Sequence, residues 1–332
     1  MNMARSAFVG GAAAALAAPL AGQAQSSGRS LRLIFFPGAD MLPVYIGMQK
    51  GFFTRENVTV VLTPTPGSVY QFQHLSAGDF DIALTAIDNV IAYDEGQGEA
   101  PLPNPADFVA ILGGDGAFLR LYARPEIASI PDLKGKTLAV DAVTTGFAFV
   151  LRAMLQNYGV NDTDVTLLPL GGTPSRYTAL LEGRCSATIL NAPFDLQAAA
   201  QGMHQLGNVR AAIGPYQGVV SVVRKPWLAQ NLPLATSYVR AMVASLRWMY
   251  DPSNAAEAIA LLADAGKMPS PLATAMLPVL IAPLDGMDRT GKIDLAGVKT
   301  VLELRSRYGK PQKTLTDPLR YYDDRAYRAA TG

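Results

Sequence analysis

The chain has 332 residues, of which 49% are hydrophobic and 17% charged, with a formal net charge of +1. This length favours two structural units over one core, and the apolar content excludes wholesale disorder. The near-zero charge argues against a nucleic-acid partner, which would need a basic excess. Cys185 is the single cysteine, which excludes an internal disulfide framework and a cysteine zinc site. His74 and His204 could share a metal only if the fold unites them, and we expect no metal and no cofactor.

Residues 1–24 have the layout of a secretory signal peptide. Arg5 precedes a small, apolar run at Ala7–Ala18, and Gly22-Gln23-Ala24 offers small residues where a signal peptidase cuts. The run is shorter than the roughly 20 residues that a membrane span needs. The alternative is a buried N-terminal helix. Without a cysteine at the cut or a twin arginine, the pattern predicts Sec-type export to the periplasm and no lipid anchor.

From Leu31 onward, short apolar runs alternate with amphipathic stretches, which predicts a mostly parallel sheet covered by helices. The first set of strands is expected at Leu31–Phe36, Val58–Leu62 and Asp81–Leu84. The first set of helices is expected at 43–51, 68–78 and Ala86–Tyr93. Prolines stand where helices can begin, and glycines where they can end.

The pattern then repeats. Strands are expected at Thr137–Val140, Val165–Leu170 and Ser186–Ile189, and helices at Thr145–Tyr158, at Pro174–Leu181 and from Pro193. Gly38 and Gly51 stand 108 residues before Gly146 and Gly159, which indicates two similar α/β units. A chance match of common α/β spacing is the alternative.

The C-terminal third is expected to add one strand and then only helices. The strand is Val219–Val223, and the helices are Leu234–Tyr250, Asn254–Ala265, Leu272–Ile281 and Leu295–Tyr308. The polar tail from Lys310 is expected to wrap over the surface.

Three phrases carry a resemblance to a known family. They are the run Leu42–Phe53 (LPVYIGMQKGFF), the run Ser76–Ala83 (SAGDFDIA) and the run Ile130–Val140 (IPDLKGKTLAV). They resemble the substrate-binding proteins of ABC importers, in the group that takes alkanesulfonates, taurine, nitrate and thiamine-pyrimidine precursors. The resemblance covers about residues 31–250.

This resemblance implies an α/β, two-lobed periplasmic-binding-protein-like fold with two inter-lobe crossovers and extra C-terminal helices. Lobe one would comprise 31–115 plus 224–332, and lobe two 124–215. The hinge crossovers would be 116–123 and 216–223. Such a protein would capture a small-molecule ligand by hinge closure and present it, as a monomer, to an ABC permease in the inner membrane.

Ligands of open parallel sheets bind beyond the carboxyl ends of the strands, so candidate residues can be chosen by position. Those of lobe one are Phe36, Gly38, Asp40, Ser68, Thr85, Asp88, Asn89 and Asp115. Those of lobe two are Thr144, Thr145, Phe147, Arg176, Asn191, Phe194 and Tyr216. The run Thr144-Thr145-Gly146 could receive an anionic or polar group at a helix start, or simply cap that helix. The phenylalanines could stack a flat ligand or belong to the core.

The candidate set holds three carboxylates, Asp40, Asp88 and Asp115, against one cation, Arg176. An aspartate is also a common turn residue. If all three line the cleft, sulfonate, nitrate and phosphate would meet unfavourable charge. The sequence therefore favours a small neutral or amine-bearing organic ligand, a class that includes heteroaromatic compounds.

Other function classes find less support in the sequence. Gly135-Lys136-Thr137 lacks the glycine that a phosphate-binding loop needs at Ile130, and neither a nucleophile elbow nor a His-Glu-x-x-His motif occurs. We expect no enzymatic activity. Two alternatives remain open, a periplasmic ligand sensor for a signalling partner and a pyrimidine-precursor synthase-like enzyme of the same fold.

Overall fold

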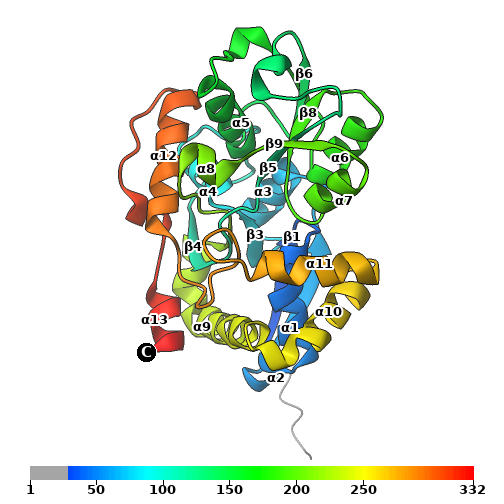
Figure 1. Ribbon diagram of the computed structural model, residues 1–332. Coiled ribbons are helices and arrows are strands. Elements are labelled where there is room, and N and C mark those ends of the chain that lie inside the picture. Colours follow the sequence, from blue (N-terminus) through cyan, green and yellow to red (C-terminus); the bar gives the residue numbers. More distant parts are fainter. Residues whose placement is uncertain (1–28) are drawn as a thin grey trace, which may run out of the picture.

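The computed structural model describes residues 29–332, and the expected signal peptide at 1–24 lies outside them. Two five-stranded sheets form the frame, in the orders β2-β1-β3-β10-β4 and β7-β6-β8-β5-β9 (Figure 1). We call the parts built on these sheets lobe one and lobe two. The repeat expected from the sequence is confirmed, because β2-β1-β3 and β7-β6-β8 have the same order and the same parallel pairing.

The strands of lobe one are β1 (Arg29–Phe35), β2 (Val58–Pro64), β3 (Ile82–Ala86), β4 (Phe108–Gly113) and β10 (Val219–Arg224). Those of lobe two are β5 (Arg120–Ala123), β6 (Thr137–Val140), β7 (Thr166–Pro169), β8 (Ala187–Leu190) and β9 (His204–Asn208). The chain passes between the sheets within 114–119 and again within 214–218. The segments expected as crossovers also contain strands. Residues 120–123 form β5, and residues 219–223 belong to β10. Both strands run antiparallel to their neighbours.

The helices near the cavity described below are α1 (Leu42–Gln49), α3 (Ser68–Ala77), α4 (Ile87–Asp94), α5 (Gly146–Gln156), α6 (Thr173–Leu181) and α7 (Phe194–Ala200). The others are α2 (Phe52–Arg55), α8 (Val209–Ile213), α9 (Lys225–Met249), α10 (Ala255–Asp264), α11 (Ser270–Leu280), α12 (Leu295–Tyr308) and α13 (Arg325–Thr331). Among residues 29–332, no helix combines the length and the apolar character needed to cross a membrane.

Both faces of the first sheet are covered, as a mostly parallel sheet requires. Leu31 and Leu33 of β1 pack with α1 and α9, whereas Ile34 packs on the opposite face with α3 and α4. The helix α12 lies against α4 in lobe one and α5 in lobe two (Figure 1). Its Leu302 shares one apolar cluster with residues of both lobes. The C-terminal segment therefore joins the lobes along one side.

The expectation for the tail was wrong in part. Tyr321 is 2% exposed, and its hydroxyl donates to Glu95 at 2.9 Å. Lys313 and Arg320 pair with the same carboxylate, and α13 packs on α9. The tail is therefore anchored to lobe one by a buried acid.

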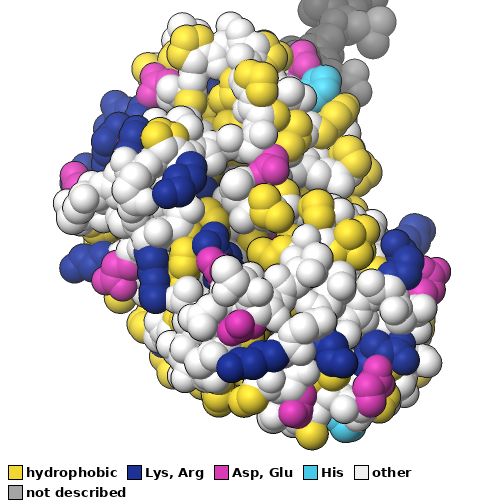
Figure 2. Space-filling model, turned by 90° about the horizontal axis from the view of Figure 1, so that it is seen from above, with side chains coloured by type: hydrophobic (Ala, Val, Ile, Leu, Met, Phe, Trp, Pro, Cys, Tyr) yellow, Lys and Arg dark blue, Asp and Glu magenta, His cyan; other side chains and the backbone are white. Residues whose placement is uncertain are grey.

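On the face shown in Figure 2, basic and acidic side chains are interspersed.

Candidate functional site

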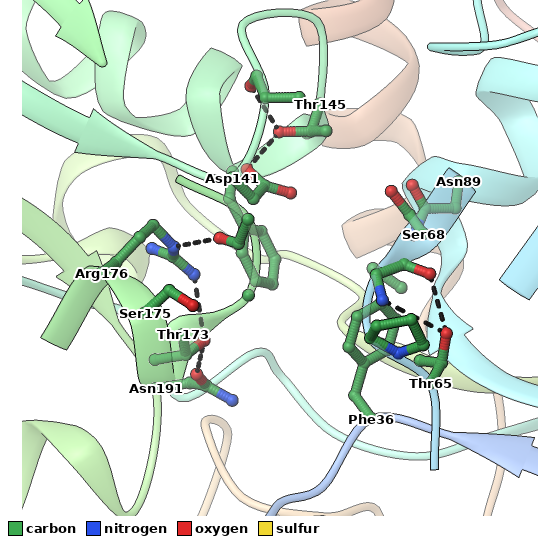
Figure 3. Close-up of a pocket in the computed structure, with 18 of the residues that line it drawn as sticks. Phe36, Thr65, Ser68, Asn89, Asp141, Thr145, Thr173, Ser175, Arg176 and Asn191 are labelled. Atoms are coloured by element: carbon green, nitrogen blue, oxygen red, sulfur yellow. Dashed lines mark hydrogen bonds between the residues drawn. The ribbon is translucent and has the colours of Figure 1, made fainter. Parts of the chain in front are cut away.

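A cavity of about 370 Å³ lies between the two lobes. Its walls come from the segments that follow β1, β2 and β3 on one side, and β6, β7 and β8 on the other. Figure 3 shows this division: Phe36, Thr65, Ser68 and Asn89 face the residues of lobe two. The carboxyl ends of the parallel strands in both sheets thus meet at one site, the position where such sheets bind ligands.

Nine of the fifteen residues chosen from the sequence line this cavity. They are Phe36, Asp40, Ser68, Asp88, Asn89, Thr145, Phe147, Arg176 and Asn191. Their contact with a ligand stays a prediction.

The other six residues lie elsewhere. Gly38 and Phe194 line a neighbouring cavity of about 200 Å³. Thr85, Asp115 and Tyr216 are buried outside the cavity lining, with exposures of 4% or less. Thr144 is half-buried outside the cavity lining, and its hydroxyl contacts Glu99.

Sequence reasoning missed several lining residues. They are Pro37, Thr65, Pro66, Gly67, Val69, Ala86, Asp141, Ala142, Gly171, Gly172, Pro174, Ser175 and Val219. Almost all belong to the same strand-end segments, from which only one to three residues each were chosen. Choosing every residue within seven positions after the carboxyl end of an expected parallel strand would have found all of them except Val219, which begins β10. The same rule would also have selected residues that are buried away from the cavity.

Asp88 is not a free carboxylate, which corrects the charge balance expected from the sequence. Nε and Nη2 of Arg305, on α12, donate to its two oxygens, and the Nε–Oδ1 distance is 2.6 Å. The side chains of this pair are 2% and 1% exposed. The backbone N–H of Gly146, at the start of α5, donates to Asp88 Oδ2 at 2.7 Å. Asp88 therefore ties α4, α12 and the first turn of α5 together across the two lobes.

Two carboxylates of the chain contact the helix start at Thr144–Gly146. The Thr145 hydroxyl donates to Asp141 Oδ1 at 2.5 Å, and Gly146 is bonded to Asp88. The expectation that this run caps its own helix is wrong for Thr145, which stands at the N-cap position but whose side chain makes no capping hydrogen bond. The carboxylate that accepts from the first N–H of α5, that of Asp88, comes from the opposite lobe.

Arg176 lines the cavity but is 2% exposed and committed to the protein. Its Nε donates to the carbonyl oxygen of Gly171, and its Nη2 donates to Thr173 Oγ1 at 2.9 Å. Nη1 donates to Thr188 Oγ1 and to the carbonyl of Ile189. These bonds fix the loop between β7 and α6 against β8. They leave the guanidinium little freedom to follow a ligand.

Three carboxyl groups in or beside the cavity have raised pKa values. Removal from water raises the pKa of Asp40 to about 6, and it raises the pKa of Asp141, which the positive charge of Arg176 partly offsets. The pKa of Asp115 is raised to about 7, mainly by removal from water and to a smaller extent by the nearby negative charge of Asp40. Asp115 Oδ1 accepts from the N–H groups of Ala117 and Val219, so this group holds the two crossovers together.

Comparison with known proteins identifies the family. The model of the family described as "NMT1/THI5 like" matches residues 39–255. No curated protein matches the sequence. The matched stretch covers most of both sheets and every strand-end segment of the cavity except Phe36 and Pro37.

Solved structures share the two-lobed fold of periplasmic binding proteins. The nitrate-binding protein NrtA of Synechocystis PCC 6803 has a TM-score of 0.76 and 14% identity, covering 91% of this chain and 88% of that one. A zinc-bound ligand-binding component of an ABC-type import system from Staphylococcus aureus has a TM-score of 0.73 and 13% identity, covering 91% and 99%.

The aliphatic sulphonate-binding protein SsuA of Escherichia coli has a TM-score of 0.68 and 16% identity, covering 89% of this chain and 92% of that one. Within residues 29–332 of this chain, no three His, Cys, Asp or Glu side chains gather as a metal site would require. On the extent of the family match, the chain belongs to the NMT1/THI5-like family.

Proposed function

We propose that this protein is the solute-binding component of an ABC importer and holds a small organic ligand between its lobes. The observation that carries the proposal is the cavity where the carboxyl ends of two repeated sheets meet. Solved structures of the same fold include a ligand-binding component of an ABC-type import system. A cavity of about 370 Å³ has the size of a small-ligand site.

The lobes, 31–115 plus 224–332 and 124–215, would close around the ligand about the segments that join the sheets. The protein would be exported by residues 1–24, act in the periplasm as a monomer and deliver its ligand to a permease in the inner membrane. Its function would be binding without covalent chemistry.

A thermal-shift screen with a blocked variant tests this proposal. Gly67 lines the cavity, and a β-carbon built on it meets no atom within 4 Å, so Gly67→Trp should fill the cavity without displacing the fold. Thr54→Trp, at an exposed position of the same lobe, is the matched control. A ligand at about 100 times its Kd adds about 2.7 kcal/mol to the folded state.

The expected result is a compound class that raises the Tm of the wild type and of Thr54→Trp by roughly 4 °C, but leaves the Tm of Gly67→Trp unchanged. Equal shifts in Gly67→Trp would show that binding occurs outside the cavity and would contradict the proposal.

A further inference from the structure

The charges around the cavity do not cancel. Three carboxylates line it, those of Asp40, Asp88 and Asp141. Arg305 neutralises Asp88 through a bidentate ion pair, and Arg176 is the other guanidinium at the site. Three negative charges against two positive ones leave the cavity with an excess of one negative charge.

Asp40 is the least compensated of these groups. It stands in the turn after β1, half-buried at the wall of lobe one, and no Lys, Arg or His nitrogen of residues 29–332 lies within ion-pair distance of it. The charge of Asp115 lies close enough to interact with it. Asp115 is itself 4% exposed, and its Oδ2 has no hydrogen-bond partner within the described chain. This side of the cavity therefore holds two neighbouring carboxyl groups and no compensating cation among the described residues.

Asp141 brings a carboxylate to the opposite wall. Its Oδ1 accepts from Thr145, and its side chain lies beside the cavity across from Ser68 and Asn89 (Figure 3). Arg176 offsets part of its charge but forms no ion pair with it within 4 Å. Each lobe thus presents one carboxylate to the space between the lobes, and neither carboxylate has an ion-pair partner among residues 29–332.

We propose that the cavity selects a ligand with a positively charged nitrogen, an ammonium or amidinium group on an apolar or aromatic body. This inference rests on the proposed function and names its substrate class. A cation between Asp40 and Asp141 would cancel the excess charge and attract both lobes toward itself. Phe36 and Phe147, which also line the cavity, offer faces to an aromatic body and to the cation.

The helix starts of α3 and α6 also reach the cavity and favour negative charge. Each contributes about half an elementary charge, so the two together match the one negative charge that the side chains leave. The sign of the preferred ligand is therefore decided locally. Beside Asp40, which has no positive side chain within ion-pair distance among residues 29–332, a cation is favoured.

Removal from water is the main reason that the pKa values of Asp40 and Asp141 are raised. A buried carboxylate without a counter-charge is costly, and a cationic ligand would supply that counter-charge. The same burial makes a hydrogen bond between a carboxylate and an ammonium group stronger than it is in water.

The test compares three probes of similar shape by calorimetric titration at pH 7.5: benzylamine, benzyl alcohol and benzenesulfonate. We expect the protonated amine to bind at least tenfold more tightly than the alcohol, and the sulfonate to bind most weakly. Asp40→Asn should weaken benzylamine at least fivefold and change benzyl alcohol by less than twofold. Asp264→Asn removes the same charge at an exposed position outside the cavity and should change neither.

Equal affinities for the amine and the alcohol, tightest binding of the sulfonate, or no binding of the amine at millimolar concentration would each overturn the inference. So would an unchanged amine preference in Asp40→Asn. If a neutral or anionic compound stabilises the wild type but not Gly67→Trp, the solute-binding proposal stands and only the cation preference falls. Failure of every compound in that comparison would count against the proposed function itself.

Discussion

Replacing Arg305 by methionine would leave the carboxylate of Asp88 buried without its counter-charge. Methionine keeps an unbranched apolar stem of similar reach, so the change isolates the guanidinium. The bond from Gly146 would remain, but a single backbone N–H does not replace two charged donors. The junction of α4, α5 and α12 would therefore lose its central ion pair.

The expected cost follows from the burial of the pair. With side chains 1% and 2% exposed, solvent cannot screen the remaining charge. Removing one partner of such a pair costs about 3–5 kcal/mol, a large part of the roughly 5–15 kcal/mol that separates folded from unfolded proteins. A second change, Asp88→Asn in the Arg305→Met background, removes the orphan charge and should recover part of this loss.

Urea denaturation at pH 7, followed by circular dichroism, measures these changes. Arg325→Met is the matched control, because Arg325 pairs with Asp323 while 53% exposed, and exposed pairs contribute about 0–1 kcal/mol. A loss below about 1 kcal/mol for Arg305→Met, or a double variant less stable than the single one, would refute this account of the junction.

Three further changes test other contacts. Gly146→Ala would place a β-carbon 2.3 Å from Asp88 Cγ and should cost about 1–3 kcal/mol in the same urea assay, whereas a change under 0.5 kcal/mol would contradict the close contact. The raised pKa of Asp115, about 7, means that the folded chain holds a proton that the unfolded chain releases near pH 4. Stability from this group is therefore lost as pH rises from 4 through 7, and Asp115→Asn should gain a few kcal/mol over the wild type by pH 8 but little at pH 4; a gap independent of pH would speak against it. Glu95→Gln should weaken the hold on Lys313 and Arg320 and speed tryptic cleavage of the tail at these residues, and unchanged cleavage rates would show that the tail does not depend on this acid.

Much of the architecture could be predicted because its signals are local. The strands β6 and β10 and the helix α12 were expected within one residue of their observed ends, since apolar runs and bounding turn residues mark them. The strands β4, β5 and β9 were missed. The first is a continuous buried run without periodicity, and the other two are short strands whose pairing comes from distant segments.

The position of the cavity could also be predicted, because strand ends share one edge of each sheet. The charge of the cavity could not. Arg305 neutralises Asp88 from 217 residues further along the chain, and nothing near either residue indicates the pairing. Asp141 was passed over although it directly follows β6, because the choice fell on the threonines after it.

The central claim, that the inter-lobe cavity holds one small molecule, is tested most directly by native mass spectrometry of the protein purified without added ligand. The account predicts a fraction of the wild type carrying a single small organic adduct, released on denaturation and absent from Gly67→Trp, with Thr54→Trp behaving as the wild type. An adduct retained by Gly67→Trp would contradict it, because the molecule would then bind outside the cavity.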